Sequence, residues 1–360
     1  MNEVECLRAL LQLALGVGEG GGVPDAAVHT LTTLDAASWE RGLARASDNR
    51  LLAPCGWALL RAGLLGAVPE PFRTRFDVAQ AEQRAHNEAR FAAFTTLVTR
   101  LRARGIDPVL LKSSALSALF YPQQAANQMG DLDLFVPAER ARDATRTLTG
   151  LGYLRGPLVA DAVDYLDGSG RVRVDLHWGF QLFEHLEWES LCEQVPATFP
   201  GVDPVRVLRP SYMLAHLVYH LNAHRPSFGY QLRWLLDVGY VLQHWPDRLD
   251  YREVERALPV RADRCNVLRA VEFFRLELGL RPPPALARYA AGIPSFTLAE
   301  VLRSQRLDPW PLSHPAGWAR LGASLAGLAQ VGYRRWPRLG DLGAVVGDRR
   351  REEQALRLTP

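Results

Sequence analysis

Apolar residues recur every three to four positions along most of the chain, which is the period of a helix that buries one face. In the N-terminal part, this spacing predicts helices over 3–15, 35–65 and 71–104. Gly105 follows the longest of these segments and is expected to end it, because glycine readily adopts the left-handed backbone at a helix C-terminus. The N-terminal part is therefore expected to be helical throughout.

The middle of the chain has a different pattern, in which apolar runs are short or alternate with polar side chains. IDPVLLK at 106–112 has the length of a strand, and DLDLFV at 131–136 alternates between polar and apolar positions. A helix is expected over 138–150. The runs 163–167 and 171–177 flank a Gly-Ser-Gly turn, which indicates a hairpin. This block is expected to be α/β in character, with a small mixed sheet.

The helical period returns from Ser211 onward and predicts three helices, of which the last covers 254–280 without a break. The chain is therefore expected to be an α+β protein with three regions. They are an N-terminal helical region at 1–88, an α/β core at 89–205 and a C-terminal helical region at 206–360.

Composition and charge narrow the class of protein. The 360 residues are 48% hydrophobic and 22% charged, which is ordinary globular composition with enough apolar material for a sizeable core. The net charge of +3 is far milder than the basic surface of a dedicated nucleic-acid binder. Nucleic acid is therefore not expected as a partner.

Cysteine usage and hydropathy indicate where the protein works. The four cysteines form no CxxC pair, which argues against a zinc ribbon or a redox dithiol. A disulfide framework is not expected in a chain of this length, so a reducing compartment is favoured. Glu3 and Glu5 argue against a signal peptide, and no apolar run reaches the roughly 18 residues of a membrane span. A cytoplasmic protein without a membrane partner is expected.

Three carboxylates in the middle block are candidates for metal chemistry. Asp131 and Asp133 lie two apart in a strand, so both side chains point to the same face and repel each other unless a cation lies between them. Asp175 lies in the run 171–177 and joins them if that strand is a neighbour. Three carboxylates with one or two Mg²⁺ ions suit phosphoryl or nucleotidyl transfer. The alternative is a solvated strand edge.

Several linked motifs resemble a known family. LLKSSALSALFY, MGDLDLFV, VRVDLHW, HLVYHLNAH and LRWLLDV occur in the order of the bacterial nucleotidyltransferase-like family with an LKG…DIDLLV…DLHW pattern. That family belongs to the DNA polymerase β superfamily, and the match covers roughly residues 90–245. The resemblance implies a polymerase β-type core with a nucleoside triphosphate as substrate. It also implies Mg²⁺ (or Mn²⁺) at three acidic residues and transfer of NMP to an acceptor.

The resemblance assigns the catalytic residues position by position. Asp131 and Asp133 match the paired metal ligands, and Asp175 matches the third carboxylate. Lys112 matches the lysine of the LKG element and is implied to meet the triphosphate as a point charge. These four residues form the centre of the expected site.

The segment after Lys112 is expected to contact phosphate and also departs from the family pattern. Ser113 and Ser114 begin the next helix, whose N-terminal amides suit phosphate binding. The family usually has glycine where Ser113 stands. It also tends to have an arginine shortly before the first aspartate, where this chain has Asn127. A second hypothesis is therefore a non-catalytic binding or scaffold relative in a biosynthetic or toxin–antitoxin system.

Three histidines, His216, His220 and His224, repeat every four residues and form one stripe on a predicted helix. One hypothesis is a zinc site, although the segment lacks an HExxH arrangement. A second interpretation places this face beside the cleft of the core, where His220 would contact the nucleotide. A third is ordinary packing and surface histidines.

Three further residues are candidates for nucleotide binding. His177 shares a strand face with Asp175 and is expected either to order that carboxylate or to approach the substrate. Arg233 and Asp237 are spaced i, i+4 on a predicted helix. They form either a surface ion pair or, as the resemblance favours, an inward-facing pair above the core.

The sequence thus predicts a Mg²⁺-dependent enzyme that moves NMP from an NTP to a hydroxyl or phosphate. The acceptor is expected to be a small molecule or a peptide.

Overall fold

A computed structural model describes residues 3–305, apart from 17–23, 122–126, 128, 160–161, 180–181, 198–201 and 229. Its elements follow in chain order: α1 (Glu3–Gly16), α2 (Asp25–Thr33), α3 (Ala36–Asp48), α4 (Leu52–Arg61), η1 (Leu65–Ala67), α5 (Glu70–Arg102), β1 (Val109–Leu110), α6 (Lys112–Leu119), β2 (Leu132–Phe135), η2 (Ala138–Arg140), α7 (Ala141–Gly150), β3 (Leu154–Val159), β4 (Ala162–Leu166), β5 (Arg173–His177), α8 (Trp188–Leu191), β6 (Cys192–Val195), β7 (Val205–Leu208), α9 (Pro210–Phe228), α10 (Leu232–His244), η3 (Pro246–Arg248), α11 (Tyr251–Ala257), α12 (Arg261–Leu278), α13 (Pro284–Ala290) and α14 (Leu298–Gln305).

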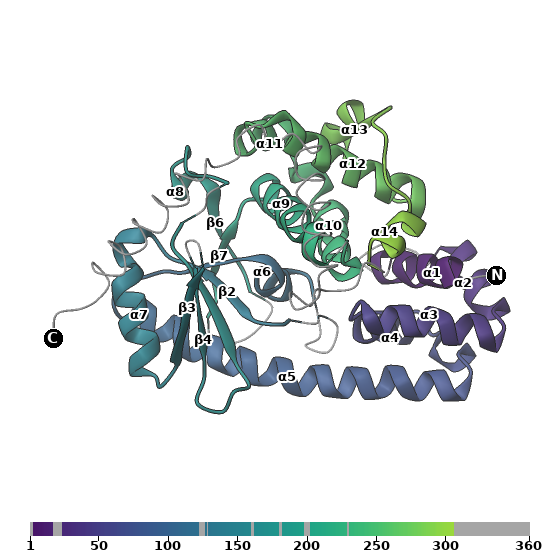
Figure 1. The fold of residues 1–360 in the computed structure, drawn as a ribbon, viewed down its shortest axis with the longest axis horizontal. Helices are drawn as coiled ribbons and strands as arrows, with labels where there is room; N and C mark the ends of the chain where they lie inside the picture. Colours follow the sequence, from purple (N-terminus) through teal and green to yellow (C-terminus); the bar gives the residue numbers. More distant parts are fainter. Residues whose placement is uncertain are drawn as a thin grey trace, which may run out of the picture. The chain divides into compact units, whose positions relative to one another are not determined.

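The sheet has seven strands in the order β3-β4-β5-β2-β1-β7-β6. The β2–β5 and β1–β7 pairs are parallel, and the other pairs are antiparallel. The sheet is mixed, which confirms the α+β class, and helices flank it (Figure 1). The predicted hairpin is confirmed, because β4 and β5 pair antiparallel with Tyr165 opposite Val174.

The sheet is larger than the sequence indicates, because three strands carry a weak pattern. β3 reads LRGPLV, and its pairing with β4 shifts register between Arg155 and Leu158. Glycine and proline lower strand propensity, and proline is tolerated at a sheet edge because it donates no ladder hydrogen bond. β6 forms the other edge with the polar sequence CEQV, and β7 has only four residues.

The N-terminal helices match the predicted segments only in part, because α2 lies outside them and the segment 35–65 is divided into α3 and α4 near Arg50, which has a φ of +56°. α5 spans 33 residues and buries Phe76, Gln83, Asn87 and Phe94 on one face. Gly105 has a φ of +69° just beyond its end, as expected of a C-terminal glycine. In Figure 1, α5 runs from the N-terminal helices to the sheet, and it contacts both α4 and α7. The long helix thus has residues beside the N-terminal helices at one end and beside α7 at the other.

The prediction of one unbroken helix over 254–280 is wrong. The structure has two helices there, α11 and α12, separated by Leu258, Pro259 and Val260. Pro259 has no N–H to donate, and it restricts the residue before it to extended backbone, so a helix is disfavoured across this point. Leu258 accordingly has a ψ of 80°.

The division into three regions stays a prediction. α5 is continuous across the proposed boundary at residue 88, and residues 306–360 of the proposed C-terminal region lie outside the described part of the chain. Among the helices described, none is both long and apolar enough to cross a membrane.

Candidate metal and nucleotide site

Two neighbouring strands bring the acidic residues together. β2 and β5 pair in parallel, with Asp133 directly opposite Asp175. Asp131 immediately precedes β2 and lies two residues before Asp133, whose charge acts on it. Asp133 is only 2% exposed, whereas Asp131 and Asp175 are half-buried. The pairing that the sequence left conditional is therefore present.

Lys112 begins α6 where β1 ends, and its ammonium group meets the carboxylates. Its Nζ donates to Asp133 Oδ1 at 2.6 Å and lies 3.9 Å from Asp175 Oδ2. The φ of Lys112 is +47°, a left-handed value that is uncommon for a residue with a side chain. The strained position in this turn is therefore Lys112 itself, and Ser113 after it is helical. Its predicted contact with triphosphate stays a prediction.

Two serine hydroxyls fasten α6 to its neighbours. Ser113 Oγ donates to Asp237 Oδ2 at 3.0 Å and accepts from Arg233 at 3.2 Å, which joins α6 to α10. Ser114 Oγ accepts from the Asp133 N–H at 3.0 Å, which joins α6 to β2. Both hydroxyls therefore hold the start of α6 beside the acidic residues.

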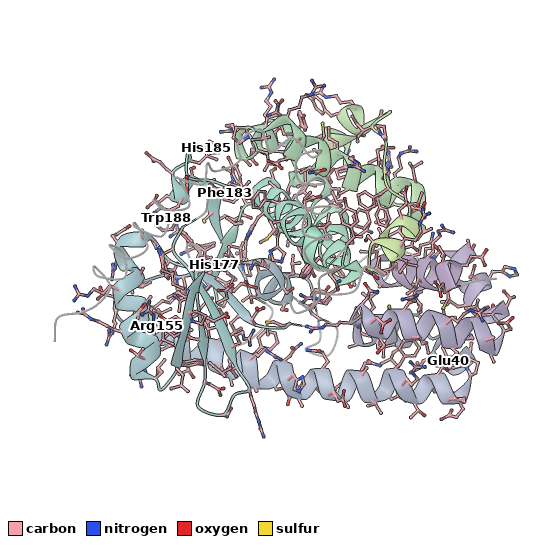
Figure 2. All side chains as sticks on the ribbon, viewed as in Figure 1. Glu40, Arg155, His177, Phe183, His185 and Trp188 are labelled. Carbon is pink, nitrogen blue, oxygen red and sulfur yellow. The ribbon has the colours of Figure 1, made fainter. Side chains whose placement is uncertain are left out.

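His177 lies on β5, two residues after Asp175, and is labelled in Figure 2. Its Nε2 is 2.9 Å from Asp175 Oδ2 and 3.6 Å from Asp133 Oδ1. Burial lowers the pKa of the imidazole, but the two carboxylates outweigh burial and raise it above its ordinary value. His177 therefore belongs to the acidic cluster itself.

The pKa values of Asp131 and Asp133 are shifted in opposite directions because their neighbours differ. The charge of Asp133, followed by burial, raises the pKa of Asp131 to about 7. Burial would also raise the pKa of Asp133, but Lys112 and His177 outweigh it and hold that pKa well below its usual range. Adjacent carboxylates that resist joint ionisation attract a cation, since added positive charge favours the ionised form of both.

A cation from a distant helix lies near the first aspartate, although this chain has Asn127 in place of the arginine of the family pattern. Asn127 is buried, and its amide donates to the Ser113 carbonyl oxygen at 3.1 Å. Arg90 on α5 instead reaches the start of β2, where it donates to the Gly130 carbonyl oxygen at 3.1 Å. Burial lowers the pKa of Arg90, and the charge of Asp131 opposes that effect. The sequence offers no signal for this contact, because Arg90 lies in a distant helix.

α10 contains a buried acid, Asp237, which contacts the start of α6 through Ser113. Asp237 is 2% exposed, so the alternative of a surface ion pair with Arg233 is wrong. Burial raises the pKa of Asp237 to about 6, which Arg233 and the hydrogen bond from Ser113 partly offset. Arg233 also lowers the pKa of Asp131. Arg233 is thus electrostatically coupled to both acids.

The histidine stripe divides in the structure. His220 packs edge-on against Trp234, with ring centroids 4.9 Å apart. His216 is buried, and burial lowers its pKa to about 3, with further lowering by the charges of Lys112 and His177. The side chain of His224 lies outside the described residues. Within the part of the chain described, these histidines form no cluster that could hold a metal.

The donor set suits a divalent cation. One ligand atom each from Asp133, Asp175 and His177 lies within 4.8 Å of the other two. Ligands bound at about 2.1 Å to one octahedral ion are about 3 Å apart at right angles and about 4 Å apart across the ion. The observed separations of 2.9 and 3.6 Å fall in this range. Asp131 lies beside this group.

The mixed sheet is flanked by helices and carries Asp133 and Asp175 on adjacent strands, with Asp131 just before β2 and the start of α6 beside them. The sequence profile of a family described as uncharacterised nucleotidyltransferases matches residues 35–276, and the chain belongs to this family. The sequence-based resemblance is therefore confirmed.

Other comparisons are more distant. No curated protein matches the chain. A solved structure of ANT(2″)-Ia in complex with adenylyl-2″-tobramycin is 15% identical, with a TM-score of 0.37. The match covers 46% of this chain and 92% of that one.

Proposed function

We propose that the protein is a divalent-metal-dependent nucleotidyltransferase that moves NMP from an NTP to a hydroxyl or phosphate of a small molecule or peptide. The observation that carries this proposal is the register of β2 and β5, which sets Asp133 opposite Asp175, with Asp131 just before β2. Membership of a nucleotidyltransferase family supports the reaction class.

Asp131, Asp133 and Asp175 are the proposed ligands of Mg²⁺ or Mn²⁺. A bound divalent ion would supply Lewis-acid polarisation of the phosphate oxygens and a lower pKa for an acceptor hydroxyl. Asp175 is the proposed acceptor of the hydroxyl proton, since it is more exposed than Asp133. The acceptor oxygen bonds to the α-phosphorus of the NTP as the bond to pyrophosphate breaks, and pyrophosphate leaves with the electron pair.

The proposed triphosphate contacts come from the elements around the carboxylates. Lys112 and Arg233 supply positive charge, Arg90 adds a third cation, and the amides of Ser113 and Ser114 begin a helix. His177 lies against Asp175 and is proposed to act together with it. His220 is proposed to meet the nucleotide from α9, and Asp237 acts through Ser113.

Nucleotide titration tests the proposed site. ATP, GTP, CTP and UTP would be titrated into the protein with Mg²⁺, with Mn²⁺ and with EDTA. The proposal predicts that at least one NTP binds only with the metal, and that Asp131→Asn/Asp133→Asn abolishes this binding.

The matched control is Asp77→Asn. Asp77 is exposed on α5, away from β2 and β5 in the sequence, and the change is expected to leave NTP binding intact. Failure of every NTP to bind under all conditions contradicts the proposal. Metal-dependent binding without transfer would favour the alternative of a non-catalytic binding protein.

A further inference from the structure

The acidic cluster contains a nitrogen donor that three aspartates alone do not provide. His177 lies on the same strand face as Asp175, and the Val136 N–H bonds to its carbonyl oxygen at 2.9 Å. That bond fixes the backbone of His177 against the chain just beyond β2. The imidazole is therefore held beside both carboxylates by the sheet itself.

The contact atom of His177 is buried and faces the carboxylates without an aligned bond. Nε2 is 2.9 Å from Asp175 Oδ2, yet within the described residues it has no hydrogen-bond partner of ordinary geometry. A buried polar atom without a partner is rare and calls for an explanation such as an absent ion. An ion shared with the carboxylates supplies that partner.

The donor set determines which ion fits. Mg²⁺ takes oxygen ligands and water, whereas imidazole suits transition-metal ions. Mn²⁺ accepts carboxylate, water and imidazole together, and it keeps the octahedral geometry that phosphate oxygens can complete. An Asp-Asp-His set therefore favours Mn²⁺ over Mg²⁺.

We propose that His177 is a metal ligand together with Asp133 and Asp175, and that this mixed nitrogen–oxygen site selects Mn²⁺ over Mg²⁺. The inference rests on the proposed function, because it concerns the same site. It changes the ligand set, since the histidine of the DLHW motif joins two of the carboxylates that the resemblance assigns to the metal. Asp131 remains available for a second ion or for water bound to the first.

Electron paramagnetic resonance on the intact protein tests this proposal without using activity. Mn²⁺ would be titrated into the wild type, and electron spin echo modulation would be recorded on the bound ion. We expect one Mn²⁺ with the modulation of a directly bound imidazole ¹⁴N. Competition with Mg²⁺ is expected to show a preference for Mn²⁺ of about tenfold or more.

Two histidine variants test whether His177 is the nitrogen ligand of the bound ion. His177→Gln is expected to remove the ¹⁴N modulation and to reduce the preference for Mn²⁺ by about tenfold or more. His185→Gln is the matched control, because His185 is exposed and contacts the Arg256 carbonyl oxygen, and it is expected to change neither readout. Circular dichroism in EDTA checks that both variants fold.

Bound Mn²⁺ without ¹⁴N modulation in the wild type overturns the proposal, and so does an unchanged metal preference in His177→Gln. Absence of metal binding also overturns it. NTP titration of the same samples distinguishes failure of the proposed function. Histidine-coordinated Mn²⁺ without NTP binding sustains the metal site and contradicts the transferase. NTP binding with Mn²⁺ that lacks ¹⁴N coupling sustains the nucleotide site and overturns His177 as a ligand.

Discussion

Lys112 is the only lysine in the sequence, although lysine and arginine together number 42. A chain that uses arginine everywhere else retains one compact ammonium group at the acidic cluster. The planar guanidinium of arginine needs more space and a different bonding pattern, so the two residues are not interchangeable here. This compositional signal is readable from the sequence alone, and it points to the same place as the aspartates.

Because Lys112 is the only lysine, its side chain can be observed by itself in an NMR spectrum. With isotopically labelled lysine, the protein gives the NMR signal of a single lysine side chain. Addition of Mg²⁺ is expected to shift that signal, because a divalent ion displaces Nζ from Asp133 Oδ1, where it now lies at 2.6 Å. In Asp133→Asn the signal is expected to start at a shifted position and to move little. A wild-type signal that stays constant while Mg²⁺ binds contradicts this exchange.

Ser113 shows how a departure from a family pattern can be compensated. The left-handed backbone falls on Lys112, so glycine is not required at the next position, and the serine hydroxyl links Asp237 to Arg233. The sequence indicates that glycine is missing, but it does not reveal a bond between residues of two distant helices. That link exists only once α6 and α10 pack together.

Asp237 predicts a pH dependence of stability. Its pKa is raised to about 6, mainly by burial, so the folded protein holds this proton more tightly than the unfolded chain does. The contribution of Asp237 to stability is therefore greatest below its ordinary pKa of about 4 and is lost as pH rises through the raised value. Arg233, Ser113 and Asp133 act on the same carboxyl.

Asp237→Asn removes this dependence while keeping an acceptor for Ser113. Relative to wild type, the variant is expected to gain about 1 kcal/mol in free energy of unfolding between about pH 5 and pH 8. Urea denaturation at both pH values measures the difference. An equal effect of the substitution at the two pH values would show that Asp237 is ionised throughout.

At the scale of elements, the spacing of apolar residues predicted most of the helices and strands. Helices α1 and α5, strands β2, β4 and β5, and the β4–β5 hairpin lie where the pattern of apolar residues indicates them, whereas α2 was not predicted and α3 and α4 were predicted as one segment. The edge strands β3 and β6 were not predicted, because their sequences LRGPLV and CEQV lack the alternating apolar pattern of a strand. The parallel pairing of β2 with β5 is a long-range contact, and no local pattern specifies it.

α1 is more deeply buried than its local sequence pattern predicts. Its spacing indicates a short amphipathic helix, yet nearly every apolar side chain from Cys6 to Leu15 is buried. The helix contacts α2, α3 and α4 and also α10 and α12 of the C-terminal part. The sequence cannot show that a terminal helix becomes an interior one.

At the scale of the whole molecule, the N-terminal helix and the C-terminal helices share one core. Gly239 on α10 is a point of close approach, because a Cβ there would lie 2.8 Å from side-chain atoms of both Leu15 on α1 and Phe274 on α12. The absence of a side chain lets three helices from distant parts of the sequence meet.

Gly239→Val is therefore expected to destabilise the protein by about 1–3 kcal/mol, because the added methyl groups overpack the junction of α1, α10 and α12. Gly66→Ala is the control, since no atom lies within 4 Å of its added Cβ. Thermal unfolding of both variants measures the effect. Equal melting temperatures for Gly239→Val and wild type would mean that α1 does not pack closely against these helices.

The site also depends on the whole molecule. Its carboxylates come from the sheet, whereas Arg90 and Arg233 come from helices on either side of it in the sequence. The acidic residues were predicted as site residues from their motif, and Arg233 was predicted from the resemblance of the sequence to the family. The sequence could not predict Arg90, because α5 must first be placed against β2.

Transfer of the nucleotide itself is the most direct test of a transferase. Each α-³²P-labelled NTP would be incubated with the protein, Mg²⁺ or Mn²⁺, and an extract of small molecules and peptides. We expect metal-dependent labelling of an acceptor with matching release of pyrophosphate, retained in Asp77→Asn and lost in Asp131→Asn/Asp133→Asn. Metal-dependent NTP binding with neither labelled acceptor nor pyrophosphate would contradict a transferase and leave a nucleotide-binding protein.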